Sequence, residues 1–324
     1  SALFSLGTKA MTASYSALAT TGHNISNANV AGYSRQQVEL ATAEGQFSGA
    51  GFYGKGVDVT TVTRAHDAFL SREAATASSL ASMDSARLNL LRQLESVFPT
   101  GEQGVGHAAG ELLNAMVDLS ARPGDSATRQ VVLARAQEVA DRFAAAGGQL
   151  DSLQLEVQEG LKASVAQVNQ LATSIAELNQ RIAAVKGLVH APNDLLDQRD
   201  QALAELSKYL QISTVQADDG SLTVFIAGGQ RLVLGTQAQP LSVQVDPSDA
   251  TRAALGLSES GFVRLHGQQE LGGGAIAGML RFQNTDLVDA RTQLGRLAAV
   301  LADQADQQQA LGLDLGLPPG SGAP

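Results

Sequence analysis

The feature that most constrains the fold is a helical period that runs through the middle of the chain. Between residues 126 and 186, apolar side chains recur at steps of three and four residues, with a stutter between Val157 and Val168. A continuous helix over this range is on the order of 90 Å long at about 1.5 Å per residue. Such a helix cannot bury its apolar stripe alone, so the sequence predicts a protein built from long packed helices.

Four further segments carry the same period. We expect helices over 64–98, 107–120, 194–210 and 275–310, the last with a strict heptad of leucines: Leu280, Leu287, Leu294 and Leu301. Aromatic residues make up only 4% of the chain and Trp is absent, which favours long packed helices over a thick globular core. The helical part is therefore predicted to be an antiparallel bundle with coiled-coil-like rods.

A period of two replaces the helical period in two places. Residues 212–264 alternate in polarity around the turn pairs Asp219-Gly220 and Gly228-Gly229, which predicts an antiparallel β domain. Residues 34–63 predict a loop with one or two short strands or a hairpin. The fold class expected is mainly α with an inserted small β domain (α+β), and Gly272–Gly274 is expected to be a hinge between them.

The first helix has an unusually thin apolar stripe. Its apolar residues recur every seven positions, at Phe4, Met11, Leu18 and Ile25, and the positions three further on are small. Lys9 is the only charged residue before Arg35, so little charge is available to solvate this helix. The pattern predicts a helix that packs against other helices, and we assign the four stripe residues to subunit assembly.

An asparagine-rich run ends this first segment. Asn24, Asn27 and Asn29 precede Gly32-Tyr33, and Asn and Gly are the residues that accept positive φ at helix ends and tight turns. We include these five residues in the predicted assembly region.

These patterns divide the chain into five parts. They are a core or polymerisation helix (1–33), a loop with short strands (34–63), a helical bundle (64–210 with 275–310), a β domain (211–274) and a disordered tail or linker (311–324).

Composition and spacing disfavour most kinds of chemistry. A net charge of −10 with no Lys/Arg cluster argues against nucleic-acid or anionic-membrane partners. The absence of Cys excludes disulfides, thiolate metal sites and a Cys nucleophile, and the five His residues are scattered. The sequence shows no secretory signal and no apolar run long enough for a membrane span. We expect neither an enzyme nor a bound cofactor.

One charged cluster stands out in the run DLLDQRDQALAEL. Arg199 lies close in sequence to Asp197 and Asp200. These residues predict either a surface or half-buried salt bridge, or a structural ion pair that fixes where the long helices meet.

Four sequence blocks carry a family resemblance. NISNANVAGYSRQ (24–36) is similar to the asparagine-rich motif of flagellar rod, hook and hook-associated proteins. The opening segment, DAFLSRE (67–73), NDLLDQRDQALAELSKYL (193–210) and GGAIAGMLRFQNTDL (273–287) follow the order seen in the first of the two junction proteins between hook and filament. Val30-Ala31 replaces the Thr-Pro common in rod and hook relatives, which disfavours a rod assignment. Nothing after Leu311 resembles the closing helix of that family, so we expect a fragment or a short member.

The resemblance implies a structural subunit that joins hook to filament. Its expected partners are copies of itself, the hook protein, the second hook–filament junction protein and the flagellar export apparatus. Its expected location is the extracellular flagellum, reached by secretion without a cleaved signal peptide. The resemblance also implies assembly by helix–helix packing between subunits.

Three other interpretations are also consistent with the sequence. One is a hook- or rod-type axial subunit, although the long helix expected over 126–186 argues against it. A second is a secreted wall hydrolase associated with the flagellum. The third is a cytosolic coiled-coil adaptor.

Overall fold

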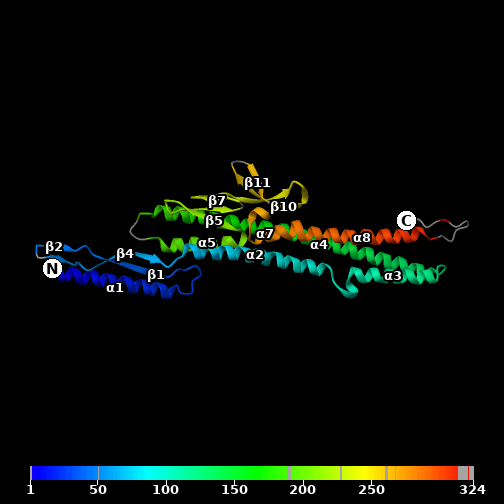
Figure 1. Ribbon diagram of the computed structural model, residues 1–324, viewed down its shortest axis with the longest axis horizontal. Coiled ribbons are helices and arrows are strands. Elements are labelled where there is room, and N and C mark those ends of the chain that lie inside the picture. The colour runs from blue at the N-terminus through cyan, green and yellow to red at the C-terminus, as the bar shows by residue number, and fades with distance from the viewer. Residues whose placement is uncertain are drawn as a thin grey trace. The chain divides into compact units, whose positions relative to one another are not determined.

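A computed structural model describes residues 2–49, 51–187, 191–226, 228–259, 262–266, 268–312 and 320. Figure 1 shows its helices and strands and labels most of them. The chain forms two compact units, each assembled from three segments. The first unit comprises Ser1–Met83, Ala163–Gln244 and Leu255–Ala277; the second comprises Asp84–Lys162, Val245–Ala254 and Gly278–Pro324.

Helices dominate both units. They are α1 (Ala2–Ser26), α2 (Ala68–Val97), α3 (Val105–Ala121), α4 (Ser126–Ala184), α5 (Asn193–Tyr209), α6 (Gln268–Leu271), α7 (Ala275–Arg281) and α8 (Leu287–Ala310), with a 3-10 turn at Gly101–Gln103. The predicted long helix is confirmed, since α4 runs for 59 residues without a break. Its apolar stripe is buried at every position from Val157 to Val168 that the period marked: Val157, Leu161, Val165 and Val168.

Two hairpins occupy the segment between the first two helices. Strand β1 (Gln36–Thr42) pairs with β4 (Val57–Arg64), and β2 (Gln46–Ser48) pairs with β3 (Gly51–Tyr53), both antiparallel. The segment thus contains two hairpins, where the sequence predicts a loop with one or two short strands or a single hairpin.

Two small antiparallel sheets follow α5. The first has four strands in the order β5 (Ile212–Gln216), β6 (Leu222–Ile226), β7 (Gln230–Leu234) and β8 (Gln237–Ala238). The second has the order β11 (Phe262–His266), β10 (Asp249–Glu259), β9 (Leu241–Asp246). Gly220, Gly228 and Gly229 have φ of 85°, 69° and 97° in the connecting turns, as expected for the predicted turn pairs. The mainly α fold with a small antiparallel β part is therefore confirmed.

In the second unit, the core lies between α3, the first part of α4 and α8. Ala108, Leu112 and Val139 are buried there, and the half-buried side chains packed against them come from the same three helices: Met116, Val132, Phe143 and Leu301. An ion pair also joins α2 to the segment before α8 within this unit. Arg87 of α2 donates from Nε and Nη2 to the two carboxylate oxygens of Asp286, each at 2.8 Å. The predicted heptad of the last helix thus contributes to this core through Leu301.

The predicted last helix contains a feature that its heptad did not indicate. Residues Phe282–Asp286 form a π-helical turn between α7 and α8. Phe282 and the next residue, Gln283, are both fully buried. A π turn inserts one residue into a helix, and here it brings two neighbouring side chains into the core.

The glycine run at 272–274 is tightly packed, so the predicted hinge is wrong. Gly272 and Gly274 have φ of 72° and 88°, and the Gly274 N–H donates to the Ser79 carbonyl at 3.0 Å. A Cβ on Gly274 would overlap the backbone of Tyr209 and Leu210. Glycine is needed here because three segments of the first unit approach closely, with no room for a side chain.

None of the described helices is long and apolar enough to cross a membrane. The expected tail or linker, 311–324, lies mostly outside the described residues.

Candidate subunit-assembly surface

Helix α1 packs on the β1–β4 hairpin through a side that is mostly small and polar, with Leu6 lying against Gly56 just before β4. Ala13 is buried at 5% exposure, and Ser16 and Thr20 are half-buried on the same side of the helix. Lys9 adds an ion pair to Asp58 of β4 at 2.7 Å. Small residues let the helix approach the strands closely, so the intramolecular contact uses little of the apolar surface of α1.

The apolar stripe of α1 lies on the opposite side and is exposed. Phe4, Met11, Leu18 and Ile25 have 81%, 74%, 71% and 72% of their surface accessible. At 100° per residue these four positions fall within a narrow arc, about half a turn away from Ala13. The small positions Gly7, Ser14, Thr21 and Ala28 flank the stripe, and Gly7, Ser14 and Thr21 are exposed as well. We call the four apolar residues the α1 stripe.

Asn24 holds the end of α1 against the first strand. Its side-chain amide donates to the Gln36 carbonyl at 2.8 Å, and its side-chain oxygen accepts the Gln36 N–H at 2.8 Å and the Tyr33 hydroxyl at 2.7 Å. The Tyr33 hydroxyl also lies 3.0 Å from Nδ1 of His23. Asn24 and Tyr33 therefore stabilise the turn between helix and hairpin from within the chain.

The other residues of the asparagine-rich run have separate positions. Asn27 donates from its side chain to the His23 carbonyl at 2.9 Å, near the end of α1, whereas Asn29 is exposed. Gly32 has φ of 80°, and a Cβ there would meet the Gln201 side chain of α5. Gly32 is thus required both by the backbone conformation and by the close approach of α5.

Two aspartates of α5 hold the base of the hairpin. Nη1 of Arg64, the last residue of β4, lies 2.9 Å from Asp197 and 2.5 Å from Asp200. The Ser34 N–H donates to Asp197 at 2.9 Å. Burial raises the pKa of Tyr33, and the charges of Asp194 and Asp197 raise it further. Since Asp197 and Arg64 are both largely buried, this pair fixes the hairpin on α5.

The structure corrects the ion pair expected within DLLDQRDQ. Asp197 and Asp200, three residues apart, share one face of α5, but Arg199 is two residues from one and adjacent to the other, so it points elsewhere. Arg199 is 3% exposed and donates to the Asn179 side-chain oxygen at 3.1 Å and to the Gly220 carbonyl at 2.8 Å. Burial lowers its pKa, an effect that the Asp200 charge opposes.

Sequence reasoning missed Arg64 and the buried amides. Arg64 ends a strand far from α5 in sequence, and no local pattern marks its partner. Asn179 carried a usable signal, because it occupies a position on the apolar stripe of α4, between Ile175 and Ile182. Polar side chains at such positions are buried only when their hydrogen bonds are satisfied, so they mark specific contacts.

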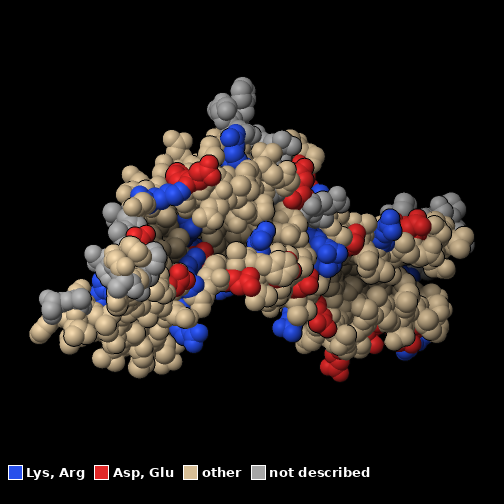
Figure 2. All heavy atoms as spheres, turned by 60° about the vertical axis from the view of Figure 1, so that its left-hand side comes forward, with Lys and Arg blue, Asp and Glu red and all other residues tan. Residues whose placement is uncertain are grey.

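The described residues offer no candidate metal cluster and no concentrated patch of charge on the face shown in Figure 2. No group of three or more His, Cys, Asp or Glu residues within the described ranges could hold a metal ion. On the face shown in Figure 2, blue and red side chains are scattered, and neither sign gathers into one patch. The α1 stripe is a row of large apolar side chains exposed on one helix of this surface.

Comparison with known proteins agrees with this architecture. A family model described as the helical domain of flagellar hook-associated protein FlgK matches residues 91–322. Flagellar hook-associated protein 1 of Salmonella typhimurium is 30% identical over 97% of this chain and 57% of its own length. The Escherichia coli protein of that name is 29% identical over 97% of this chain and 58% of its own length.

A solved structure has the same fold. The flagellar hook junction protein FlgK from Burkholderia pseudomallei matches with a TM-score of 0.70 and 31% identity, covering 78% of this chain and 46% of that chain. The chain thus spans just over half the length of the two curated relatives named above. From the family match over most of its length, the chain belongs to the family of flagellar hook-associated protein FlgK.

Proposed function

We propose that this chain is part of a structural subunit that joins hook to filament in the bacterial flagellum. Membership of the FlgK family supports this proposal. The chain also resembles a solved structure that is described as a flagellar hook junction protein. The single observation that carries it is the exposed α1 stripe on a helix that the chain itself holds in place. The subunit acts by assembly and has no catalytic role.

The α1 stripe supplies the free energy for that assembly. Fully burying a large apolar side chain is worth about 1.5–3 kcal/mol, so each stripe residue covered by a neighbouring helix contributes on that scale. The flanking small residues let a partner backbone come close, as at Gly7, where an added Cβ would meet nothing within 4 Å.

The contacts behind α1 prepare it for binding. Asn24 ties its end to Gln36, Lys9 ties its middle to Asp58, and Ala13 packs on the hairpin. A helix that is already ordered loses less conformational entropy when a partner binds. The hairpin therefore presents the stripe to a partner subunit.

The parts of the chain take different roles in this proposal. Residues 1–33 form the polymerisation helix, supported by the 34–63 hairpins. The helical part, 64–210 with 275–310, is the stiff body that carries load, and the 211–274 β domain is attached to it. Residues 311–324 serve as a linker or tail.

The proposed partners are copies of the same chain, the hook protein and the second hook–filament junction protein. The subunit is secreted through the flagellar export apparatus without a cleaved signal peptide and works in the extracellular flagellum. Nucleic acid is not among its partners, in keeping with the net charge of −10.

An assembly assay with charged variants tests this proposal. In the full-length protein, Leu18→Asp or Ile25→Asp places a charge in the stripe, and we expect loss of filament attachment and motility with an unchanged thermal melt. Ala19→Asp is the matched control, because Ala19 is exposed on α1 but lies off the stripe. Normal flagella in the Leu18→Asp strain would show that the stripe is not the assembly surface.

A further inference from the structure

Four carboxamide side chains make one and the same contact with a strand. In each, the side-chain amide donates to the carbonyl of a strand residue, and the side-chain oxygen accepts the N–H of that same residue. The pairs and their two distances are Asn24 with Gln36 (2.8 and 2.8 Å), Asn169 with Leu241 (2.9 and 2.8 Å), Asn179 with Leu222 (2.7 and 3.0 Å) and Gln283 with Ala253 (2.9 and 3.0 Å). The first three lie within the first unit and the last within the second.

This contact reproduces a step of an antiparallel ladder. Directly opposed residues in such a ladder exchange two N–H···O bonds, and a carboxamide carries a donor and an acceptor side by side. Gln36, Leu222 and Leu241 are the first residues of β1, β6 and β9. The helix side chain therefore occupies the position that a residue of a neighbouring strand would take.

Strand β6 shows why such a partner is needed. Its ladder with β7 covers Val224 to Ile226, so Leu222 lies beyond the paired part. Asn179 bonds the Leu222 backbone at this point in place of a strand residue. Its second N–H donates to the Gly235 carbonyl of the β7–β8 turn at 2.7 Å. The fully buried amide thus satisfies backbone groups that the ladder leaves open.

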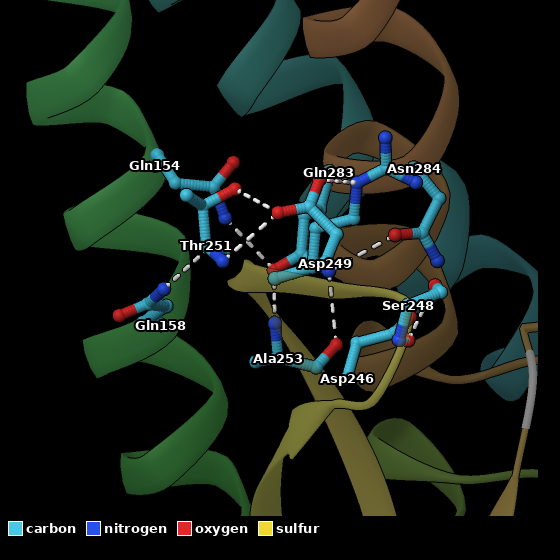
Figure 3. Close-up of polar contacts among 10 residues, drawn as sticks. Gln154, Gln158, Asp246, Ser248, Asp249, Thr251, Ala253, Gln283 and Asn284 are labelled. Atoms are coloured by element: carbon cyan, nitrogen blue, oxygen red, sulfur yellow. Dashed lines mark hydrogen bonds and ion pairs between the residues drawn. The ribbon is translucent and has the colours of Figure 1, made fainter.

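The side-chain amide of Gln283 has a complete set of hydrogen bonds, shown in Figure 3. Besides Ala253, its Nε2 donates to the Asn284 side-chain oxygen at 3.0 Å, and its Oε1 accepts from Nε2 of Gln154 at 3.0 Å. Both donors and both lone pairs of the amide are used. The π turn places Gln283 in this buried position, so strand β10, the π turn and α4 are joined within the second unit.

We propose that these four carboxamides act as register pins, each fixing which strand residue faces a given turn of its helix. Apolar side chains pack with many neighbours, and a strand that slips by one residue exchanges its two faces. A carboxamide accepts only a residue whose N–H and C=O both point toward the helix. A one-residue slip would therefore leave the buried amide and the backbone unpaired.

Gln283→Glu tests the pin by changing one donor group. Its carboxylate cannot donate to the Ala253 carbonyl, whereas the neutral acid has one donor and one acceptor and can rebuild the pair. Burial beside a carbonyl raises the pKa of the new side chain above its unfolded value. The variant should therefore be close to wild-type stability at low pH and lose stability as pH rises through the unfolded pKa towards the folded one, because the unfolded chain then releases a proton that the folded chain retains.

The charged groups near this site are the same in wild type and variant. They are Asp246, Asp249 and Arg252 around the β9–β10 turn, the Arg87–Asp286 pair at the π turn, and Arg291 of α8, which pairs with Asp151 and whose charge reaches Asp249. The groups bonded directly to Gln283 are neutral: Gln154, Asn284 and the Ala253 backbone. Their charges act on the new carboxyl only in the variant, where the aspartates raise its pKa and the arginines lower it.

The measurement is the melting temperature of the whole chain from about pH 4 to about pH 8. We expect Gln283→Glu to melt on the order of 5 °C below wild type at neutral pH, with the gap closing at low pH. Gln283→Met should show a deficit that does not close, because it lacks both bonds at every pH. Gln293→Glu, exposed on α8, should match wild type throughout.

Several results would contradict the proposal that Gln283 fixes the register of β10. A Gln283→Glu protein with wild-type stability at neutral pH would do so, as would a deficit of equal size at both ends of the pH range. If Gln283→Glu unfolds completely when the pH is raised from 4 to 8, while Gln293→Glu does not, the proposal is supported.

Hydrogen exchange at a milder site gives a second test. Asn169 is only half-buried, and Asn169→Ala removes the oxygen that accepts the Leu241 N–H, so it should speed exchange of that N–H at least tenfold relative to wild type. Gln170→Ala, exposed on the next position of α4, should leave that rate unchanged. Equal rates in both variants would show that Asn169 does not hold Leu241.

Discussion

At the scale of single residues, polar side chains define the specific contacts of this chain. Arg64 binds two aspartates of α5, Asn24 binds the backbone of Gln36, and Asn179 joins α4 to β6 and to the β7–β8 turn. Apolar periodicity in the sequence predicts which faces are buried, but it does not say which residue meets which. That information lies in contacts between residues distant in sequence, such as Arg64 and Asp197.

Arg64→Met tests the ion pair at the base of the hairpin. Removing one partner leaves Asp197, whose side chain is 8% exposed, as an unpaired buried charge. We expect the free energy of unfolding to fall by about 3 kcal/mol, as measured by denaturant titration. Lys208→Met, which breaks an exposed i, i+3 pair with Glu205, should cost well under about 1 kcal/mol. Equal losses would contradict a structural role for Arg64.

Glu138 gives a pH-dependent prediction. Hydrogen bonds from Arg135 and Arg142 lower the pKa of Glu138 below its ordinary value. A carboxyl with a lowered folded pKa stabilises the protein above its unfolded pKa, and this contribution is lost as pH falls through the folded value. The melting temperature of Glu138→Gln should therefore lie below wild type at neutral pH and converge with it in acid. Glu177→Gln, at an exposed position of α4, is the control. A gap that widened in acid would contradict this.

At the scale of elements, the sequence predicted helices better than their junctions. The helical period gave α4 almost to the residue, and the heptad located the last helix, but neither indicated the π turn at Phe282–Asp286. A π turn depends on what the core requires around Gln283, which local patterns do not record. The glycine run at 272–274 was misread because glycine allows both flexibility and close packing, and only the neighbouring segments distinguish them.

Gly274→Ala tests the close approach at that junction. Gly274 has positive φ, and a Cβ would overlap the backbone of Tyr209 and Leu210, so we expect a loss of more than about 2 kcal/mol in unfolding free energy. Gly295→Ala is the matched variant, since nothing lies within 4 Å of its Cβ in α8. It should gain about 0.5–1 kcal/mol, because Ala favours a helix interior. If Gly274→Ala kept the wild-type free energy of unfolding, the result would favour the hinge hypothesis.

At the scale of the whole molecule, the two faces of α1 differ in what covers them. The small face is covered by the chain's own hairpin, and the α1 stripe is exposed. The heptad predicted such a stripe from the sequence, and the exposure of its residues supports a role in assembly. The sequence could not predict that the hairpin covers the opposite face, because that contact joins α1 to strands that begin after residue 35.

The most direct test is to measure the accessibility of the stripe before and after assembly. These 324 residues contain no Cys, so within them Leu18→Cys provides one thiol for maleimide labelling. In the full-length protein we expect rapid labelling of the isolated subunit and at least tenfold slower labelling in assembled flagella. Gln180→Cys, exposed on α4, is the reference for general crowding. Equal labelling of Leu18→Cys in the free and assembled states would contradict the central claim that α1 packs between subunits.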